Sequence, residues 1–182
     1  MGMLVELDHN LVDVMPSLQS PVLTSVFIVL SAWWVKGPLL IGLGLAADLR
    51  RRRLPVAFLA AGVATLVTAE VVGLLKNAFD RPRPPQSDPG LGSLVALPHN
   101  PSFPSGHAAT AFAAATAIAI LCPKLRPWAL ALAAAVALSR VYLRVHFPLD
   151  VLAGGLIGVG FGALAAFVAL SAVRLRQRPA AA

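Results

Sequence analysis

The sequence predicts an all-α protein, a polytopic bundle of five or six helices that span a membrane. Of its 182 residues, 58% are hydrophobic and only 13% are charged, whereas a soluble domain usually carries about 25% charged residues. The hydrophobic residues gather in runs long enough for membrane helices. The basic residues gather in the short connections between these runs, as they do on the cytoplasmic side of membrane proteins. The length suits one domain.

Residues 1–20 are predicted to form an amphipathic helix at the membrane interface. Leucines and valines recur there at roughly helical spacing, with acidic residues between them. No basic segment precedes the first apolar run, so no signal peptide is expected. The absence of Lys and Arg before Lys36 favours an N-terminus on the outer side.

The first apolar run, residues 21–49, is interrupted by Lys36-Gly37-Pro38. Proline suits the first turn of a helix and disrupts its middle. Two interpretations therefore stay open: one long span with a break, or a short helix over 21–35 packed before a second span at 38–49. The choice decides whether the protein has five or six spans, and an outer N-terminus favours five.

Four further spans are predicted at 54–79, 105–121, 128–145 and 150–173. Their alternate ends carry basic clusters, which the positive-inside rule places in the cytoplasm. The sequence thus predicts a membrane domain over 21–175 and a basic cytoplasmic tail over 176–182. Glycines recur every four residues in the last span and predict close helix packing, whereas Glu70 is expected to hydrogen-bond to a neighbouring helix. The basic clusters and these glycines are Arg50 to Arg53, Lys124 and Arg126, Arg174, Arg176 and Arg178, and Gly154, Gly158 and Gly162.

Three polar clusters fall at the opposite, outward ends of the spans. Charged groups and histidines at membrane depth are costly, so they mark functional sites. Together the clusters supply three cations, two imidazoles and one carboxylate, which suits an anion such as phosphate at the outer membrane surface. The clusters are Lys76 with Arg83-Pro84, then Pro104-Ser105-Gly106-His107, then Ser139-Arg140 with His146 and Asp150.

Each cluster has its own chemistry. Ser105-Gly106 opens a helix, where free N–H groups and a close backbone approach favour an anion, although a capped helix beside a histidine is equally common. A carboxylate near His146 would fix its tautomer and stabilise positive charge on its ring. Seven residues separate Ser139 from His146, which predicts one face of a helix. Two cations could clamp phosphate oxygens, but chemistry does not choose between Arg81 and Arg83.

In order and spacing, the three clusters resemble the signature of the type 2 phosphatidic acid phosphatase superfamily. That superfamily also includes vanadium haloperoxidases, glucose-6-phosphatase and bacterial acid phosphatases. All signature positions match, and the spacing selects Arg83. The resemblance implies a helical fold of the phosphatase and haloperoxidase kind over about residues 20–175.

The resemblance also implies roles for the catalytic residues. His146 would attack phosphorus and form a phosphohistidine, and Asp150 would orient and stabilise its ring. His107 would protonate the leaving oxygen and later activate water. The family works without a metal, and a single carboxylate in the motifs also makes a two-metal site improbable. No cofactor is therefore expected.

The same resemblance assigns the phosphate-binding residues. Lys76, Arg83 and Arg140 would bind phosphate oxygens, with Ser105 and the Gly106 N–H assisting. This agrees with the charge stabilisation that phosphoryl transfer requires.

The sequence therefore predicts a metal-independent lipid phosphatase of the cell membrane, with its site on the extracytoplasmic face. Candidate substrates are a polyprenyl pyrophosphate such as undecaprenyl pyrophosphate, phosphatidate or phosphatidylglycerol phosphate. The alternatives are a vanadate-dependent haloperoxidase and a non-catalytic lipid-binding membrane protein. Nucleic acid is not an expected partner, because no soluble basic face is present. Homo-oligomerisation stays open, and the single Cys122 excludes an intrachain disulfide.

Overall fold

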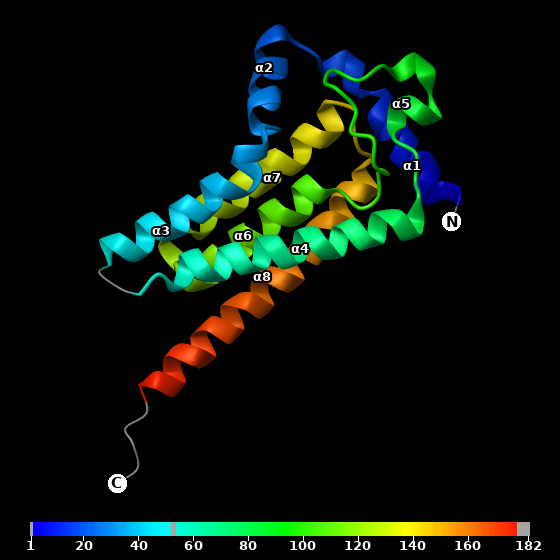
Figure 1. The fold of residues 1–182 in the computed structure, drawn as a ribbon. Coiled ribbons are helices and arrows are strands. Elements are labelled where there is room, and N and C mark those ends of the chain that lie inside the picture. Colours follow the sequence, from blue (N-terminus) through cyan, green and yellow to red (C-terminus); the bar gives the residue numbers. More distant parts are fainter. Residues whose placement is uncertain (1, 52–53, 178–182) are drawn as a thin grey trace.

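The computed structural model describes residues 2–51 and 54–177, with side chains from residue 6 onward. The predicted cytoplasmic residues Arg52 and Arg53, and the part of the tail from Arg178 onward, lie outside the described residues. Across the described ranges every regular element is helical (Figure 1). The α-helices are α1 (Gly2–Asp13), α2 (Pro21–Leu30), α3 (Leu40–Arg50), α4 (Val56–Phe79), α5 (Pro84–Ser87), α6 (Gly106–Leu121), α7 (Arg126–Tyr142) and α8 (Pro148–Arg176). The short turns are 3-10 at Met15–Leu18, Pro89–Leu91 and Pro123–Leu125, and π-helical at Val35–Leu39.

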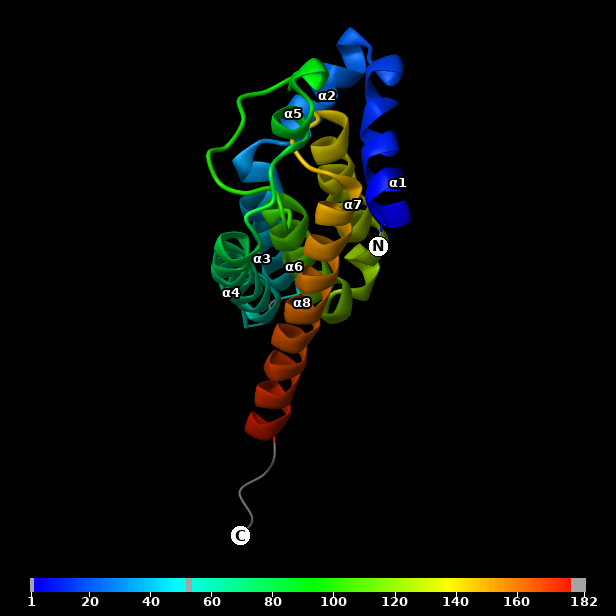
Figure 2. The same ribbon diagram turned by 90° about the vertical axis from the view of Figure 1, so that its right-hand side faces the viewer.

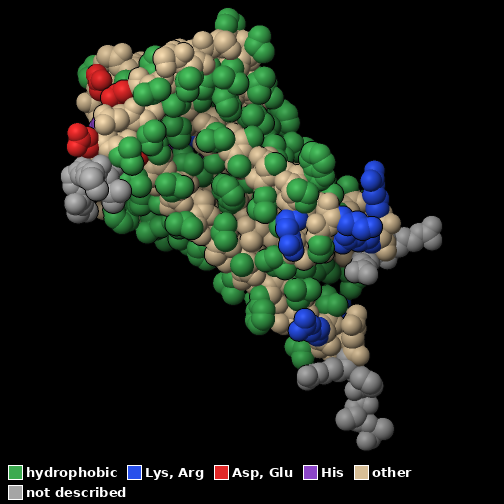
Figure 3. Space-filling view, turned by 180° about the vertical axis from the view of Figure 1, so that it is seen from behind, with side chains coloured by type: hydrophobic (Ala, Val, Ile, Leu, Met, Phe, Trp, Pro, Cys, Tyr) green, Lys and Arg blue, Asp and Glu red, His purple; other side chains and the backbone are tan. Residues whose placement is uncertain are grey.

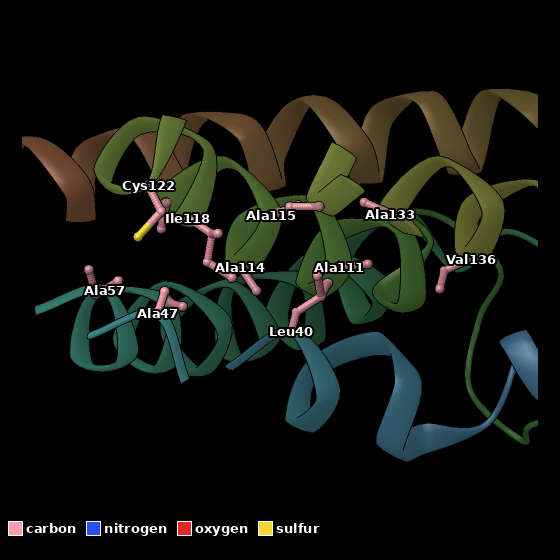
Figure 4. Packing of buried hydrophobic residues seen from close by; sticks show 14 of the residues in the cluster. Leu40, Ala47, Ala57, Ala111, Ala114, Ala115, Ile118, Cys122, Ala133 and Val136 are labelled. Atoms are coloured by element: carbon pink, nitrogen blue, oxygen red, sulfur yellow. The ribbon is translucent and has the colours of Figure 1, made fainter. Parts of the chain in front are cut away.

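Helix α6 is the centre of the bundle and packs against α4, α7 and α8. Alanine dominates its sequence, and nearly every residue from Ala108 to Ala119 is buried. Such small side chains let the neighbouring backbones approach closely, which is how helices associate in a membrane. The core around α6 is accordingly built mainly of alanines, with Leu40, Ile118 and Val136 filling the wider gaps (Figure 4).

Helix α8 meets α6 along its glycines. A Cβ at Gly158 or Gly162 would collide with the α6 backbone, and one at Gly154 with the backbone of Ser105, the residue that caps α6. The predicted role of these glycines in close packing is confirmed. The last turns of α8 extend beyond the bundle (Figure 2).

The first apolar run is a bent pair of helices. Helix α2 ends at Leu30, and the helix that resumes at Val35 is turned by 68°. The bend is therefore at residues 31–34 and not at Lys36-Gly37-Pro38, as the sequence had suggested. Pro38 lies inside the π-helical turn that leads into α3, where the altered hydrogen-bond pattern accommodates a residue that has no N–H.

Two other helix ends differ from the prediction. Helix α7 stops at Tyr142 and not near residue 145, and Arg144 follows with a positive φ of 58°. Helix α1 stops at Asp13, and a 3-10 turn containing Pro16 replaces the continuous helix expected within residues 1–20.

The helices have the apolar character of a membrane protein. Among the described residues, the long helix that begins at Val56 and α8 are long and apolar enough to span a bilayer, and the bent pair would make a third span. Helix α6 is apolar but shorter. These criteria do not confirm the predicted five or six spans, which stay a prediction.

Charges gather at the two ends of the molecule. Basic side chains cluster at the end where α3 and α8 finish, and acidic ones at the end that carries α1 and the 80–103 loop, with an apolar body between them (Figure 3). Glu70 is an exception, because it is exposed on α4 and has no hydrogen-bond partner in the described part of the chain. The prediction that it bonds to a neighbouring helix is wrong.

Candidate active site

His146 and Asp150 form the centre of the candidate site. His146 lies in the turn between α7 and α8, and Asp150 lies in the first turn of α8. His146 Nδ1 is 3.5 Å from Asp150 Oδ2. The same carboxylate oxygen accepts hydrogen bonds from Ser102 Oγ at 2.5 Å and from the Phe147 N–H at 2.9 Å. Both side chains are almost completely buried, so the ring has a fixed orientation.

The other ring nitrogen of His146 faces Arg83. Arg83 Nη1 lies 3.3 Å from His146 Nε2 and donates to the Val145 carbonyl at 2.6 Å. Its remaining nitrogens bind the segment just before Ser102, including the Asn100 carbonyl at 3.0 Å and the Asn100 Oδ1 at 2.7 Å. Of the two Arg-Pro pairs, the second is thus the one at the candidate nucleophile, as the family spacing had implied.

His146 is neutral over the physiological pH range. Burial is the main cause that lowers its pKa, to about 3, and the Arg83 and Arg140 guanidiniums lower it further, while Asp150 acts in the opposite direction. A neutral ring with its proton on Nδ1, toward the carboxylate, leaves the lone pair on Nε2. Nε2 is therefore the nitrogen that could react.

Lys76 holds the same loop from the end of α4. Its Nζ donates to the carbonyls of Pro101 and, at 3.2 Å, Ser102. Buried ammonium groups require such partners. Lys76 and Arg83 therefore both reach the backbone of residues 100–102, which places these two predicted cations around the loop that carries Ser102.

His107 and Arg140 meet at Ser31, in the bend after α2. His107 Nε2 is 3.1 Å from the Ser31 carbonyl, and Arg140 Nη1 donates to Ser31 Oγ. A carbonyl only accepts, so Nε2 of His107 carries its proton. Arg140 Nε is buried and lacks a partner among the described residues. Lys36, which the sequence analysis did not assign to the site, also interacts electrostatically with both side chains.

The remaining predicted residues divide into two groups. Ser105 caps α6, because its Oγ accepts from the Ala108 N–H at 3.5 Å, and its own N–H donates to the Asp150 carbonyl at 2.9 Å. Gly106 follows as the first residue of α6. Ser139 is not brought into the site: its hydroxyl donates to the Val136 carbonyl at 2.6 Å. The argument that placed it on one helical face with His146 is wrong, because α7 ends between them.

Three contacts at this site were not predicted from the sequence. Ser102 lies between His146 and Asp150, with its Oγ 3.3 Å from His146 Nδ1. Arg81 Nη1 donates to the free oxygen of Asp150, Oδ1, at 2.6 Å. Arg81 Nη2 donates to Asp8 of α1 at 2.5 Å. The duplicated Arg-Pro dipeptide could have indicated that both arginines contact the same site. No spacing pattern in the sequence connects Asp8 to that site.

A match to a protein-family model shows which family the chain belongs to. The model of the PAP2 superfamily matches residues 57–174. The chain belongs to the PAP2 superfamily. The resemblance read from the three clusters is thereby confirmed, and with it the expectation of an enzyme of the phosphoric ester hydrolase class.

Individual PAP2 proteins agree with this assignment. The decaprenylphosphoryl-5-phosphoribose phosphatase of Mycobacterium tuberculosis is 36% identical over 138 residues, which cover 75% of this chain and 73% of the relative. The crystal structure of a transmembrane PAP2-type phosphatidylglycerolphosphate phosphatase from Bacillus subtilis superposes with a TM-score of 0.75 at 25% identity, over 98% of this chain and 90% of that one. The crystal structure of LpxE from Aquifex aeolicus gives a TM-score of 0.70 at 29% identity, over 86% of this chain and 92% of that one. The protein is thus a PAP2-type membrane protein.

Proposed function

We propose that this protein is a metal-independent lipid phosphatase that acts through a phosphohistidine on His146. The observation that carries the proposal is the environment of that ring. Its Nδ1 side is held by Asp150 and Ser102, and its Nε2 side faces the Arg83 guanidinium. A neutral imidazole oriented by a carboxylate, with a cation beside its free nitrogen, is suited to attack a phosphoryl group.

The reaction has two steps. In the first, the Nε2 lone pair of His146 forms a bond to phosphorus and the bond from phosphorus to the lipid oxygen breaks. His107 enters this step as an imidazolium, keeps the Nε2 proton on the Ser31 carbonyl and gives the lipid oxygen its Nδ1 proton. In the second, His107 takes a proton from water as the water oxygen attacks phosphorus, and the P–N bond breaks to release phosphate and regenerate Nε2. Asp150 stabilises the positive charge on the ring between the steps.

The cations of the site would hold the phosphate oxygens. Arg140 presents a buried Nε that has no partner in the described chain, and an unsatisfied buried donor is costly unless a ligand uses it. Arg83 and Lys76 donate to loop carbonyls, so phosphate would replace some of these bonds. Ser105 and the N–H of Gly106, at the start of α6, add donors at a helix N-terminus.

The donor set supports a reaction without a metal. No group of three or more His, Cys, Asp or Glu side chains that could hold an ion occurs among the described residues. The charge that a metal would provide in phosphoryl transfer is available instead from the three predicted cations. We accordingly propose no cofactor.

The substrate is proposed to be a lipid phosphate at the extracytoplasmic membrane surface. The site lies where α4 ends and where α6 and α8 begin. The basic side chains gather at the other end of the bundle (Figure 3), which the positive-inside rule assigns to the cytoplasm. In this scheme residues 1–20 lie at the interface, 21–175 span the membrane several times, and 176–182 form the cytoplasmic tail. The Mycobacterium relative's name describes a polyprenyl-linked phosphate, so polyprenyl phosphates and diphosphates are our first candidates.

The proposal is tested by phosphate release from detergent-solubilised protein in EDTA, with wild type, His146→Ala and His99→Ala compared. His99 is an exposed histidine of the outer loop and serves as the matched control. We expect wild type and His99→Ala to release phosphate equally and His146→Ala to lose at least about 1,000-fold, as for loss of a nucleophile. Equal release from wild type and His146→Ala would defeat the proposed nucleophile.

The substrate is identified by a panel of a prenyl diphosphate, phosphatidate and phosphatidylglycerol phosphate, ranked by kcat/KM. Peroxide-dependent halide oxidation in place of phosphate release would instead support the haloperoxidase alternative. A wild type that is inactive in both assays would support the lipid-binding alternative.

A further inference from the structure

Arg81 joins two buried carboxylates from opposite ends of the sequence. Its Nη1 donates to Asp150 Oδ1 at 2.6 Å, and its Nη2 donates to Asp8 Oδ2 at 2.5 Å. Both carboxylate side chains have no exposed surface, while that of Arg81 is 22% exposed. One guanidinium thus links the N-terminal helix to the carboxylate that orients His146.

Asp8 makes a second contact with the same part of the molecule. Its Oδ1 accepts from the Leu149 N–H at 2.8 Å, in the first turn of α8. That N–H has no partner within its own helix, so Asp8 of α1 caps the helix that carries Asp150. The two oxygens of Asp8 therefore hold the backbone next to Asp150 and the cation bound to Asp150.

Apolar contacts keep α1 in this position. Val12 is completely buried against Phe147 and Leu91. The ring of His9 packs on Phe147 at 4.6 Å, and the Arg81 guanidinium lies 4.2 Å from the centre of the same ring. Phe147 is the residue between His146 and Pro148. Helix α1 thus packs directly on the turn that holds the proposed nucleophile.

A contribution to stability does not by itself explain the buried chain of ion pairs from Asp8 through Arg81 to Asp150. A buried ion pair often contributes no more to stability than apolar side chains of the same volume, because both charges lose their hydration. A carboxylate–cation–carboxylate chain that ends on a reacting pair has an electrostatic use, because it fixes how much negative charge Asp150 offers to its histidine.

We infer that Asp8 and Arg81 are positioning residues of the reaction, so that α1 is a working part of the active site. This inference rests on the proposed phosphohistidine mechanism. Arg81 holds Oδ1 of Asp150 and thereby turns Oδ2 toward His146 and Ser102. Asp8 balances the charge of Arg81, so that Asp150 keeps enough negative charge to stabilise the ring when it carries phosphorus.

The two residues have opposite effects on the charge of Asp150. Without the Asp8 charge, the full positive charge of Arg81 acts on Asp150. Asp150 then stabilises the positive charge of the phosphorylated ring less well. Without Arg81, the two carboxylates at the start of α8 repel each other and Asp150 turns away. Removing the charges of both Arg81 and Asp8 relieves that repulsion. Adding Asp8→Asn to Arg81→Gln should therefore restore part of the turnover rate that Arg81→Gln loses.

The test compares Asp8→Asn, Arg81→Gln, the double variant and Asp13→Asn in detergent, with kcat and KM measured for the best substrate of the panel. Asparagine keeps an oxygen for the Leu149 N–H and removes only the charge. Asp13 is an exposed aspartate of the same helix and is the matched control. We expect kcat to fall about 10-fold in Asp8→Asn and about 10- to 100-fold in Arg81→Gln, the effect of a lost charge-assisted hydrogen bond, with KM nearly unchanged.

The double variant is decisive. We expect it to turn over faster than Arg81→Gln, because Asp8 no longer repels Asp150. Losses that multiply in the double variant indicate two independent structural effects and overturn the inference. An active wild type with Asp8→Asn equal to Asp13→Asn overturns this inference alone, whereas an inactive wild type overturns the proposed function as well.

A further variant keeps the inference testable if Arg81→Gln misfolds. Arg81→Lys keeps a cation between the two carboxylates but loses the planar fork that binds both at once. We expect its kcat to lie between wild type and Arg81→Gln, with each protein first shown to be monodisperse in detergent. Equal losses in Arg81→Lys and Arg81→Gln would contradict a role for the charge.

Discussion

His146 combines deep burial with a proposed covalent role. Its ring is 2% exposed and lies between a carboxylate on one side and a guanidinium on the other. The two neighbours have opposite electrostatic effects, and burial decides in favour of the neutral ring. The fold thus keeps the ring of the proposed nucleophile neutral without a dedicated base.

The first prediction concerns pH and stability. The pKa of His146 is about 3 in the folded protein, against an ordinary value of 6.5. Between these values the unfolded chain binds a proton that the folded protein does not, so stability is complete above pH 6.5 and falls as the pH is lowered toward 3. Each pH unit within this window removes up to about 1.4 kcal/mol.

The measurement is the denaturation midpoint in detergent at pH 7 and pH 4.5. His146→Asn should lose less stability between the two pH values than wild type, because asparagine does not titrate. His99→Asn removes an exposed ring and should behave as wild type does. A pH dependence that is the same in His146→Asn and wild type would argue against a buried neutral imidazole.

The contacts that could be predicted from the sequence are those between residues close together in the chain. His146 and Asp150 are four residues apart, and their pairing could be predicted. Ser102 and Asp8 could not be predicted, because they reach Asp150 and Leu149 from 48 and 141 residues away. Nothing in a local pattern indicates such contacts, which depend on how the loop and α1 pack.

At the scale of elements, the contact between α6 and α8 positions both halves of the site. Helix α6 begins at Gly106 beside His107, and α8 begins at Pro148 beside Asp150. The Ser105 N–H donates to the Asp150 carbonyl at 2.9 Å, so the two helix starts are directly joined. The close approach along the glycines of α8 sets the distance between the proposed acid and the proposed nucleophile.

The second prediction tests this approach with Gly158→Ala. The added Cβ would lie 2.9 Å from the Ala113 nitrogen and closer still to the Ala109 carbonyl oxygen. Both are backbone atoms that cannot turn away. We expect a loss of about 1–3 kcal/mol or more of stability, the usual effect of overpacking, measured as a lower melting temperature in detergent.

Gly160→Ala is the matched control in the same helix. Gly160 is exposed, and a Cβ there would have no neighbour within 4 Å. Its melting temperature should stay near that of wild type, since alanine is the better helix former. Equal melting temperatures for Gly158→Ala and wild type would mean that α6 and α8 are not in close contact.

The order of the helices followed from hydropathy, whereas the end of α7 did not. Helix α4 was predicted over 54–79 and is found at Val56–Phe79. Helix α7 was predicted to continue to residue 145, because no proline or glycine interrupts the sequence before that point. It ends earlier because Arg144 takes a left-handed conformation, and the N–H groups of Val145 and His146 turn back to the Arg140 carbonyl. Tertiary packing outweighs local propensity there.

At the scale of the whole molecule, the charges divide the bundle into two ends and an apolar body. Large side chains such as Leu66 on α4 and Leu156 on α8 are exposed along this body. A groove of about 580 Å³ between the first half of α4 and the last half of α8 is lined almost entirely by apolar residues. Exposed surface of this kind is stable in lipid and unfavourable in water.

The last prediction concerns the orientation of the two ends in the membrane. The site and the 80–103 loop should face the outside, and the basic turn at Lys124 should face the cytoplasm. In a Cys122→Ser background, Ser87→Cys should react with a membrane-impermeant maleimide on intact cells, and Lys124→Cys only after permeabilisation. Both positions are exposed, so they differ in side and not in accessibility. The reverse pattern would place the site on the cytoplasmic face and restrict the substrate to lipids of that leaflet.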